Sequence, residues 1–383
     1  MRVFFRLVGI SLFALIAVGC GGGTPEAQNA PPQEKSPLDD AGEQELVREA
    51  EEEGEVVVYS FTSRIEEVEP AFEEAYPGVD LVGSDIDSTE QIQRIKSEEQ
   101  AGNVNADVAF LADAPIAIEE LVRPGLLQKY VPPDVAGAVP DELEEPLISQ
   151  RLSTKVLMYN EEANPDGPPV QNLWELTEPE WSGRVVTVDP QVRGDYLDLM
   201  TEIVMRPDEM AAAYEEHFGE AIQEPENAGE QWVRDFYAND PVFVDDTDNV
   251  NAAVGEKGQE SPPVGFTSYS DIRDNEDEDW ALQVADGVDP APGIAYPVYL
   301  GVVKDAPNPA AARLLIRFLM GDDSSDGGPG YEPFFVPGDY AARENIELYP
   351  DSLSLEQLGA WSIDPDRLLQ RRQETADLLL TLE

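Results

Sequence analysis

The sequence predicts an α/β protein with mixed, mainly parallel sheets, and two observations in its N-terminal third carry that prediction. Residues 55–59, 79–82 and 106–111 are short apolar runs, typical of strands that are buried on both faces. Amphipathic helices separate them, as shown by the spacing of Ile65, Val68 and Phe72. Strands alternating with helices favour parallel pairing through crossover connections.

Further strands and helices are expected along the rest of the chain. Residues 294–304 read as a strand pair or as one bent strand. Asn308 and Pro309 are typical of a helix start, with Asn as the cap and Pro in the first turn. The segment 353–380 is expected to be mainly helical. Other apolar runs predict strands at 155–160, 184–188 and 264–266 and helices at 195–205, 208–218 and 228–238.

The N-terminus predicts an exported, membrane-anchored protein. Arg2 and Arg6 precede an apolar stretch over 8–18, which is too short to span a membrane comfortably. Small residues lead into Cys20 and resemble a bacterial lipobox, although Ala17 stands where Leu is usual. We therefore expect a signal peptide over 1–19, a lipid anchor on Cys20 and a flexible tether over 20–40. An ordinary signal peptide with an incidental cysteine is the alternative.

The charge is strongly negative and spread over the whole chain. The sequence holds 24 basic and 79 acidic residues and a net charge of −55, so nucleic-acid binding is excluded. Such a surface is typical of adaptation to high salt, where the charges are screened. A calcium-stabilised acidic surface protein is an alternative, but the runs 245–248 and 274–279 lack the spacing of a calcium loop. Because Cys20 is the only cysteine, an internal disulfide is impossible.

No catalytic motif stands out, so we expect a protein that is not an enzyme. His217 is the single histidine, and no G-x-S-x-G, H-E-x-x-H, P-loop or G-x-G-x-x-G motif occurs. A secreted hydrolase on the same scaffold stays open as an alternative, because the many carboxylates do not rule out a catalytic pair.

Five segments of the sequence, in order, resemble one known family. The run EGEVVVYS at 53–60 and the run LWELTEPEWSGRVV at 173–186, which is the most specific match, are similar to segments of family 1 extracellular solute-binding proteins, in particular of the branch that includes the ferric-ion-binding proteins. The other matches lie at 92–98 together with 106–108, at 157–160 and at 308–320. The similarity covers about residues 43–345.

The resemblance implies a two-lobed periplasmic-binding-protein type II fold with a ligand cleft between the lobes. Lobe 1 would hold 41–156 and 295–345, lobe 2 would hold 157–294, and C-terminal helices in 346–383 would pack on a lobe. The implied function is a solute-binding lipoprotein of an ABC importer, on the periplasmic or cell-surface side. Its partners would be an ABC permease and ATPase, and it would act as a monomer.

Candidate ligand-binding residues lie beyond the carboxyl ends of the predicted strands, where ligands of open α/β sheets bind. Arg193 and Gly194 precede a predicted helix, whose N-terminus favours an anion. Most of the other candidates are arginines, which are scarce in this acidic sequence, or residues with a side-chain hydroxyl. The candidates are Tyr59, Ser60, Ser63, Arg64, Ser88 and Asp113 in lobe 1, and Tyr159, Arg193, Gly194, Ser268 and Tyr269 in lobe 2.

Ferric iron is an alternative cargo, and no cofactor is expected. The resemblance implies two adjacent tyrosines, often with a histidine after the first strand, but Tyr269 is followed by Ser270 and that histidine is absent. Asp85 or Asp87 is the candidate for the family's carboxylate. Because Fe³⁺ prefers several anionic oxygens, this set favours a small polar or anionic solute over the metal.

Overall fold

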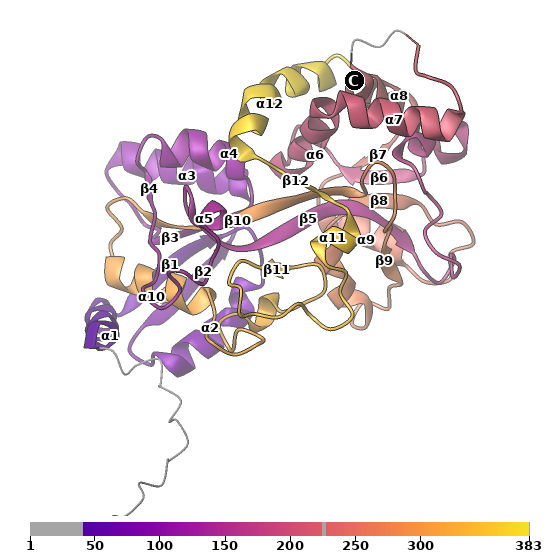
Figure 1. The fold of residues 1–383 in the computed structure, drawn as a ribbon. Helices are drawn as coiled ribbons and strands as arrows, with labels where there is room; N and C mark the ends of the chain where they lie inside the picture. The colour runs from indigo at the N-terminus through magenta and orange to yellow at the C-terminus, as the bar shows by residue number, and fades with distance from the viewer. Residues whose placement is uncertain (1–40, 224–226, 383) are drawn as a thin grey trace, which may run out of the picture.

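The computed structural model describes residues 41–223 and 227–382. Within these residues, twelve strands form one continuous sheet, whose main path has the order β2-β1-β3-β10-β5-β8-β6-β7. Two groups of elements lie on either side of the central strands (Figure 1), and we call them the first and second lobes. The predicted mixed α/β class is confirmed.

The first lobe is built on three parallel strands. In β1 (Glu55–Ser60), Tyr59 pairs with Ser84 of β2 (Asp80–Asp85) and with Ala109 of β3 (Val108–Leu111). Since β1 lies between the other two, Val56 and Val58 are fully buried. The surrounding elements are α1 (Ala41–Glu53), α2 (Ile65–Ala75), α3 (Ser88–Ala101), α4 (Ala114–Ala117), η1 (Ile118–Val122), β4 (Leu127–Gln128), α5 (Asp141–Glu144) and α10 (Pro309–Leu319).

Two long antiparallel strands connect the lobes. β5 (Ile148–Asn160) pairs with β10 (Gly293–Val303) along most of their length, and β10 also pairs with β3 while β5 pairs with β8. β10 is a single strand with one irregularity between Val298 and Tyr299, so the bent-strand alternative holds. Both expected lobe boundaries, 156/157 and 294/295, fall inside these two strands.

The second lobe repeats the parallel arrangement. β6 (Val185–Val188) runs parallel to both β8 (Val264–Thr267) and β7 (Val242–Val244). The predicted helices at 195–205, 208–218 and 228–238 are confirmed as α6 (Gly194–Met205), α7 (Pro207–Phe218) and α8 (Ala228–Ala238). The remaining elements are η2 (Leu173–Thr177), η3 (Pro179–Trp181), α9 (Thr247–Gly255), η4 (Tyr269–Asn275) and β9 (Leu282–Val284).

The C-terminal segment returns across both lobes. After η5 (Glu332–Phe334) and β11 (Tyr340–Ala341) it forms α11 (Leu355–Leu358), β12 (Trp361–Ser362) and α12 (Pro365–Leu379). The expected helical content is thus interrupted by β12, which pairs with β10. α12 packs against α6 of the second lobe and α4 of the first, as its yellow ribbon shows in Figure 1.

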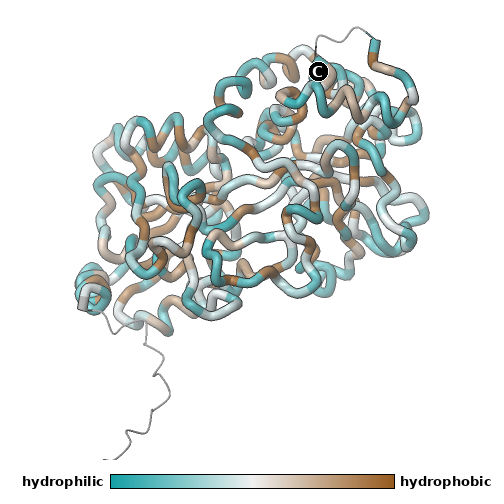
Figure 2. The backbone as a smooth tube through the Cα atoms, viewed as in Figure 1, coloured by the Kyte–Doolittle hydropathy of each residue, from teal (hydrophilic) through white to brown (hydrophobic). Residues whose placement is uncertain are grey.

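The helices alternate between hydrophilic and hydrophobic positions along their length (Figure 2), as expected for elements with one face on a core. In α10, for example, Leu314, Leu315 and Leu319 are fully buried. Among the described residues, no helix is both long and apolar enough to cross a membrane.

Candidate functional site

The carboxyl ends of the parallel strands of the two lobes meet in the middle of the molecule. In the first lobe, β3 leads into Asp113, and in the second, β6 leads through Asp189 to Gly194 at the start of α6. Asp113 Oδ2 lies so close to Gly194 that a Cβ on this glycine would come within 1.9 Å of it. Any larger residue at 194 would therefore displace the side chains of Asp113 and Arg372. The position expected for a bound anion, at the start of α6, is taken by the carboxylate of Asp113.

Arg372 of α12 joins this contact, and the sequence reasoning missed it. Its Nη1 and Nη2 donate to the two carboxylate oxygens of Asp113 at 2.6 and 3.0 Å, and its Nε lies 3.2 Å from Asp198 Oδ1 of α6. Burial raises the pKa of Asp198 well above its usual range, although Arg372 opposes the shift. A signal was present, because Arg372 continues the helical spacing of the buried residues Leu368, Thr375 and Leu379.

A cavity of about 260 Å³ adjoins this three-way contact. Its walls come from α3 and α4 of the first lobe, from the segment between β6 and α6 of the second lobe, and from α12. Asp113, Gly194 and Arg372 form part of its lining. The other polar lining residues are Thr89, Gln93, Gln191 and Gln373, and the apolar ones include Ile92, Ile116, Val192, Leu197 and Leu369. Its size and mixed lining suit a small organic solute.

A charged cluster lies beneath the start of α6. Lys155 of β5 is buried, donates to Ser268 Oγ at 2.9 Å and lies 3.1 Å from Asp195 Oδ2. Arg193 is 3.4 Å from the same carboxylate oxygen. Burial opposes ionisation of Asp195, but Arg193 and Lys155 outweigh it and hold its pKa at about 2. Lys155 and Arg193 thus share Asp195, the carboxylates of Asp87 and Asp271 also lie near these cations, and Arg193 is half-buried.

The predicted residues that follow β1 have other partners. Arg64 is buried, its Nη1 is 2.6 Å from Asp339 Oδ2, and it also donates to the carbonyl of Pro333. Ser60 Oγ donates to the carbonyl of Thr62, and Ser88 Oγ accepts from the N–H of Ala112. These hydrogen bonds join side chains to backbone groups within the first lobe and stabilise its loops. Only Ser63 of this stretch is exposed.

The candidate residues Tyr59 and Tyr159 have contacts away from the strand ends that meet between the lobes. Tyr59 donates its hydroxyl to Glu98 Oε1, ten residues along α3 from Ser88. At a rise of about 1.5 Å per residue, Glu98 lies at the opposite end of that helix. Tyr159 pairs with Gln283 of β9, beyond the part of β5 that pairs with the end of β8. Both side chains serve packing within a lobe.

The residues proposed for iron are dispersed in the same way. The hydroxyl of Tyr269 accepts the N–H of Leu353 at 3.2 Å, and Asp87 caps α3 by accepting from the N–H groups of Thr89 and Glu90. Asp85 is exposed, and its pKa is raised by partial burial and by the carboxylates of Glu66 and Asp248. No cluster of three or more His, Cys, Asp or Glu placed to hold a metal occurs in the described ranges.

Comparison with known proteins identifies the family. Residues 57–325 match the model of a family described as bacterial extracellular solute-binding protein. No curated protein sequence matches the chain significantly.

Several solved structures share the fold. Iron-bound HitA from Pseudomonas aeruginosa aligns with a TM-score of 0.65 at 20% identity, covering 86% of this chain and 99% of that one. AfuA from Actinobacillus pleuropneumoniae, bound to fructose-6-phosphate, aligns at 0.63 and 18%, covering 86% and 97%. Apo ferric ion-binding protein A from Pasteurella haemolytica aligns at 0.62 and 18%, covering 86% and 98%. The likeness confirms the two-lobed fold that the sequence resemblance implied.

Proposed function

Because this chain belongs to the bacterial extracellular solute-binding proteins, we propose that it captures a small polar or anionic solute between its lobes and delivers it to an ABC permease and its ATPase. The cavity of about 260 Å³ between both lobes and α12 is the observation that carries the proposal. A solute that touches both walls would stabilise the closed arrangement and leave slowly.

The lining of the cavity and its neighbourhood favour a polar organic solute. Hydroxyl and amide groups from Thr89, Gln93 and Gln373 offer both donors and acceptors. Just outside, the side chain of Arg193 is 25% exposed and offers a guanidinium to an anionic group of the same solute. High salt screens the net charge of −55, which would otherwise repel an anion from the protein.

Iron is the second candidate cargo, favoured by the structural likeness to proteins described as iron-bound or ferric-binding. That likeness also includes a protein bound to a sugar phosphate, so the fold serves chemically different cargo. Tyr269 is buried and its hydroxyl accepts the N–H of Leu353, so iron coordination would require the surrounding segment to move away from this oxygen. We therefore rank the polar solute first. A tyrosinate-to-iron absorption band that appears on ferric loading and disappears in Tyr269→Phe, but persists in Tyr159→Phe, would reverse this order.

A thermal-shift screen of the mature protein in high salt tests solute capture. The panel is phosphonates, sugar phosphates, sugars, amino acids, polyamines and ferric chelates. We expect one class to raise the melting temperature, and Gln93→Ala to reduce that rise while the exposed Arg48→Ala leaves it unchanged. No stabilisation by any class would contradict the proposal, and turnover of a chromogenic ester or glycoside would support the hydrolase alternative.

The lipid anchor belongs to the same proposal. Cys20 and the signal peptide over 1–19 lie outside the described residues, as does the expected tether over 20–40. We propose that acylated Cys20 keeps the protein near its permease on the outer side of a membrane. Metabolic labelling with palmitate should mark the wild type and not Cys20→Ser. Equal labelling of both would exclude Cys20 as the anchor.

A further inference from the structure

The C-terminal segment is attached to both lobes and to the strands between them. β12 pairs with β10, and Trp361 Nε1 of β12 donates to Glu209 Oε2 of the second lobe at 2.9 Å. On the other side, Arg123 of the first lobe lies 3.1 Å from Asp366 of α12. A helix fixed at both lobes must change its contacts whenever the lobes separate.

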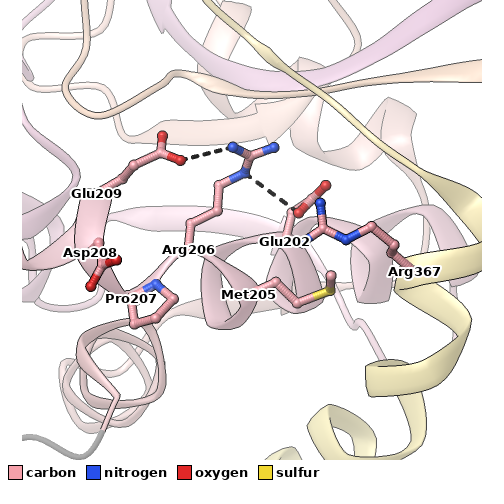
Figure 3. Close-up of a pocket in the computed structure, with 7 residues that line it drawn as sticks. All are labelled: Glu202, Met205, Arg206, Pro207, Asp208, Glu209 and Arg367. Carbon is pink, nitrogen blue, oxygen red and sulfur yellow. Dashed lines mark hydrogen bonds and ion pairs between the residues drawn. The ribbon is translucent and has the colours of Figure 1, made fainter.

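The second-lobe attachment is shown in Figure 3. Arg206 lies 2.9 Å from Glu209 and 3.5 Å from Glu202, and its guanidinium also lies over the ring of Trp361 at 4.8 Å. Arg367 of α12 faces the same group of carboxylates. Trp361 therefore fixes this end of the C-terminal segment to Arg206 and Glu209 of the second lobe.

Arg372 is the one residue of α12 that pairs with both lobes at once. It binds Asp113 of the first lobe with two hydrogen bonds and lies beside Asp198 of the second, and all three side chains are at least 94% buried. The carboxylates of Asp195 and Glu202 lie nearby and add negative potential at Asp198. Without Arg372, the buried carboxyl groups of Asp113 and Asp198 would lose the side chain that joins them across the contact, which disfavours closure.

We propose that Arg372 sets the closure equilibrium of the two lobes, with α12 acting as a strap that favours the closed arrangement before any solute binds. The strap makes α12 a third structural part of the cleft, since Arg372 also lines the cavity. Loss of the strap would lower the closed fraction, and the apparent affinity for any solute that needs the closed form would fall by the same factor. The proposal does not depend on which solute is bound.

The distance between the lobes in the solute-free protein tests this. Spin labels at Glu67→Cys on α2 and Glu216→Cys on α7, both exposed, are introduced into full-length Cys20→Ser, because Cys20 is the only native cysteine. We expect one main distance in this background. Arg372→Met should broaden the distribution and move it to longer distances, because it removes the cation and keeps much of the side-chain volume.

Two further variants keep the test decisive if Arg372→Met does not fold. Asp113→Asn keeps the size of the side chain but weakens the link to the first lobe, so it should also open the lobes. Gly194→Ala should open them by displacing the paired side chains of Asp113 and Arg372. Arg371→Ala is the matched control, because Arg371 neighbours Arg372 on α12 but is 42% exposed and pairs with Glu374 of α12 and, at 3.9 Å, with Glu230 of the second lobe. Distributions unchanged from the background in Arg372→Met and Asp113→Asn would overturn the proposal, as would equal opening in Arg371→Ala.

Discussion

The loop after β1 and the loop after β6 carry the same sequence signal but have different surroundings. Each follows a buried strand and presents an arginine at the end of a parallel sheet. The side chain of Arg64 is 7% exposed and paired with Asp339, whereas that of Arg193 is 25% exposed and shares Asp195 with Lys155. The first loop is part of the core of its lobe, while the second remains accessible beside the cavity.

The difference comes from segments far away in the sequence. Asp339 lies 275 residues after Arg64, and it also binds Arg151, which is fully buried among the rings of Phe61, Phe110 and Phe334. A distant segment also reaches the loop after β6, because α12 lies against Gly194, but it leaves the side chain of Arg193 25% exposed. A polar residue at a strand end therefore predicts where a site lies, but distant partners decide whether the residue can reach a ligand.

Replacing Arg64 should have the largest effect on stability. Arg64→Met leaves the carboxylate of Asp339 with one cation in a buried setting, and we expect a loss of about 3 kcal/mol in the free energy of unfolding. Denaturant titration in high salt measures it. A loss no larger than that of the exposed Arg48→Ala would show that the pair is not structural and would return Arg64 to the list of solute ligands.

Replacing Arg193 should instead affect binding. For an anionic solute found in the screen, Arg193→Met removes a charged hydrogen-bond donor, and we expect about tenfold weaker binding. Isothermal titration gives the dissociation constant, and denaturant titration should show a smaller change in stability than for Arg64→Met. Unchanged affinity together with a large loss of stability would make the two loops equivalent.

Asp198 should show a smaller, pH-dependent effect. Because its folded pKa is raised by burial, it contributes stability below its ordinary pKa of about 3.9, and this contribution is lost as pH rises towards the folded value. Asp198→Asn cannot ionise, so its melting temperature should exceed that of the wild type at pH 7 and approach it near pH 4. A variant that is less stable at pH 7 would show that the ionised pair with Arg372 outweighs burial.

The smallest expected effect is that of Tyr269→Phe. It removes the acceptor for the N–H of Leu353, and we expect a loss of about 1 kcal/mol in the free energy of unfolding. Affinity for the polar solute should not change. Loss of solute binding without loss of stability would place Tyr269 in the cleft and contradict the position described here.

Local patterns were sufficient to predict the fold but not all its contacts. The spacing of apolar residues predicted β1, β3 and the second-lobe helices, because a buried element carries apolar residues at regular intervals along its own short stretch of sequence. The helix start at Pro309 was also predicted, but its cap was not. The side chain of Asn308 makes no capping hydrogen bond. Instead, the carboxylate of Glu53, which lies 257 residues before Ala310, accepts from the N–H of Ala310. Such a partner leaves no local signal.

The site was predicted in part for the same reason. Asp113 and Gly194 were candidates because they follow strands, and the structure brings them into contact between the lobes, with Arg193 as the neighbour of Gly194 in the chain. Lys155 was hidden in an apolar strand, and Arg372 lay in a segment beyond the family resemblance. Only the tertiary contact of α12 with both lobes brings Arg372 to the cleft.

Hydrogen exchange with and without the solute identified in the screen tests solute capture between the lobes most directly. A solute held in the cavity should protect peptides that cover Thr89 to Gln93 of the first lobe and Gln191 to Leu197 of the second, at the same solute concentration. Protection limited to one lobe, or located outside these segments, would contradict the proposal that the solute is bound between the two lobes.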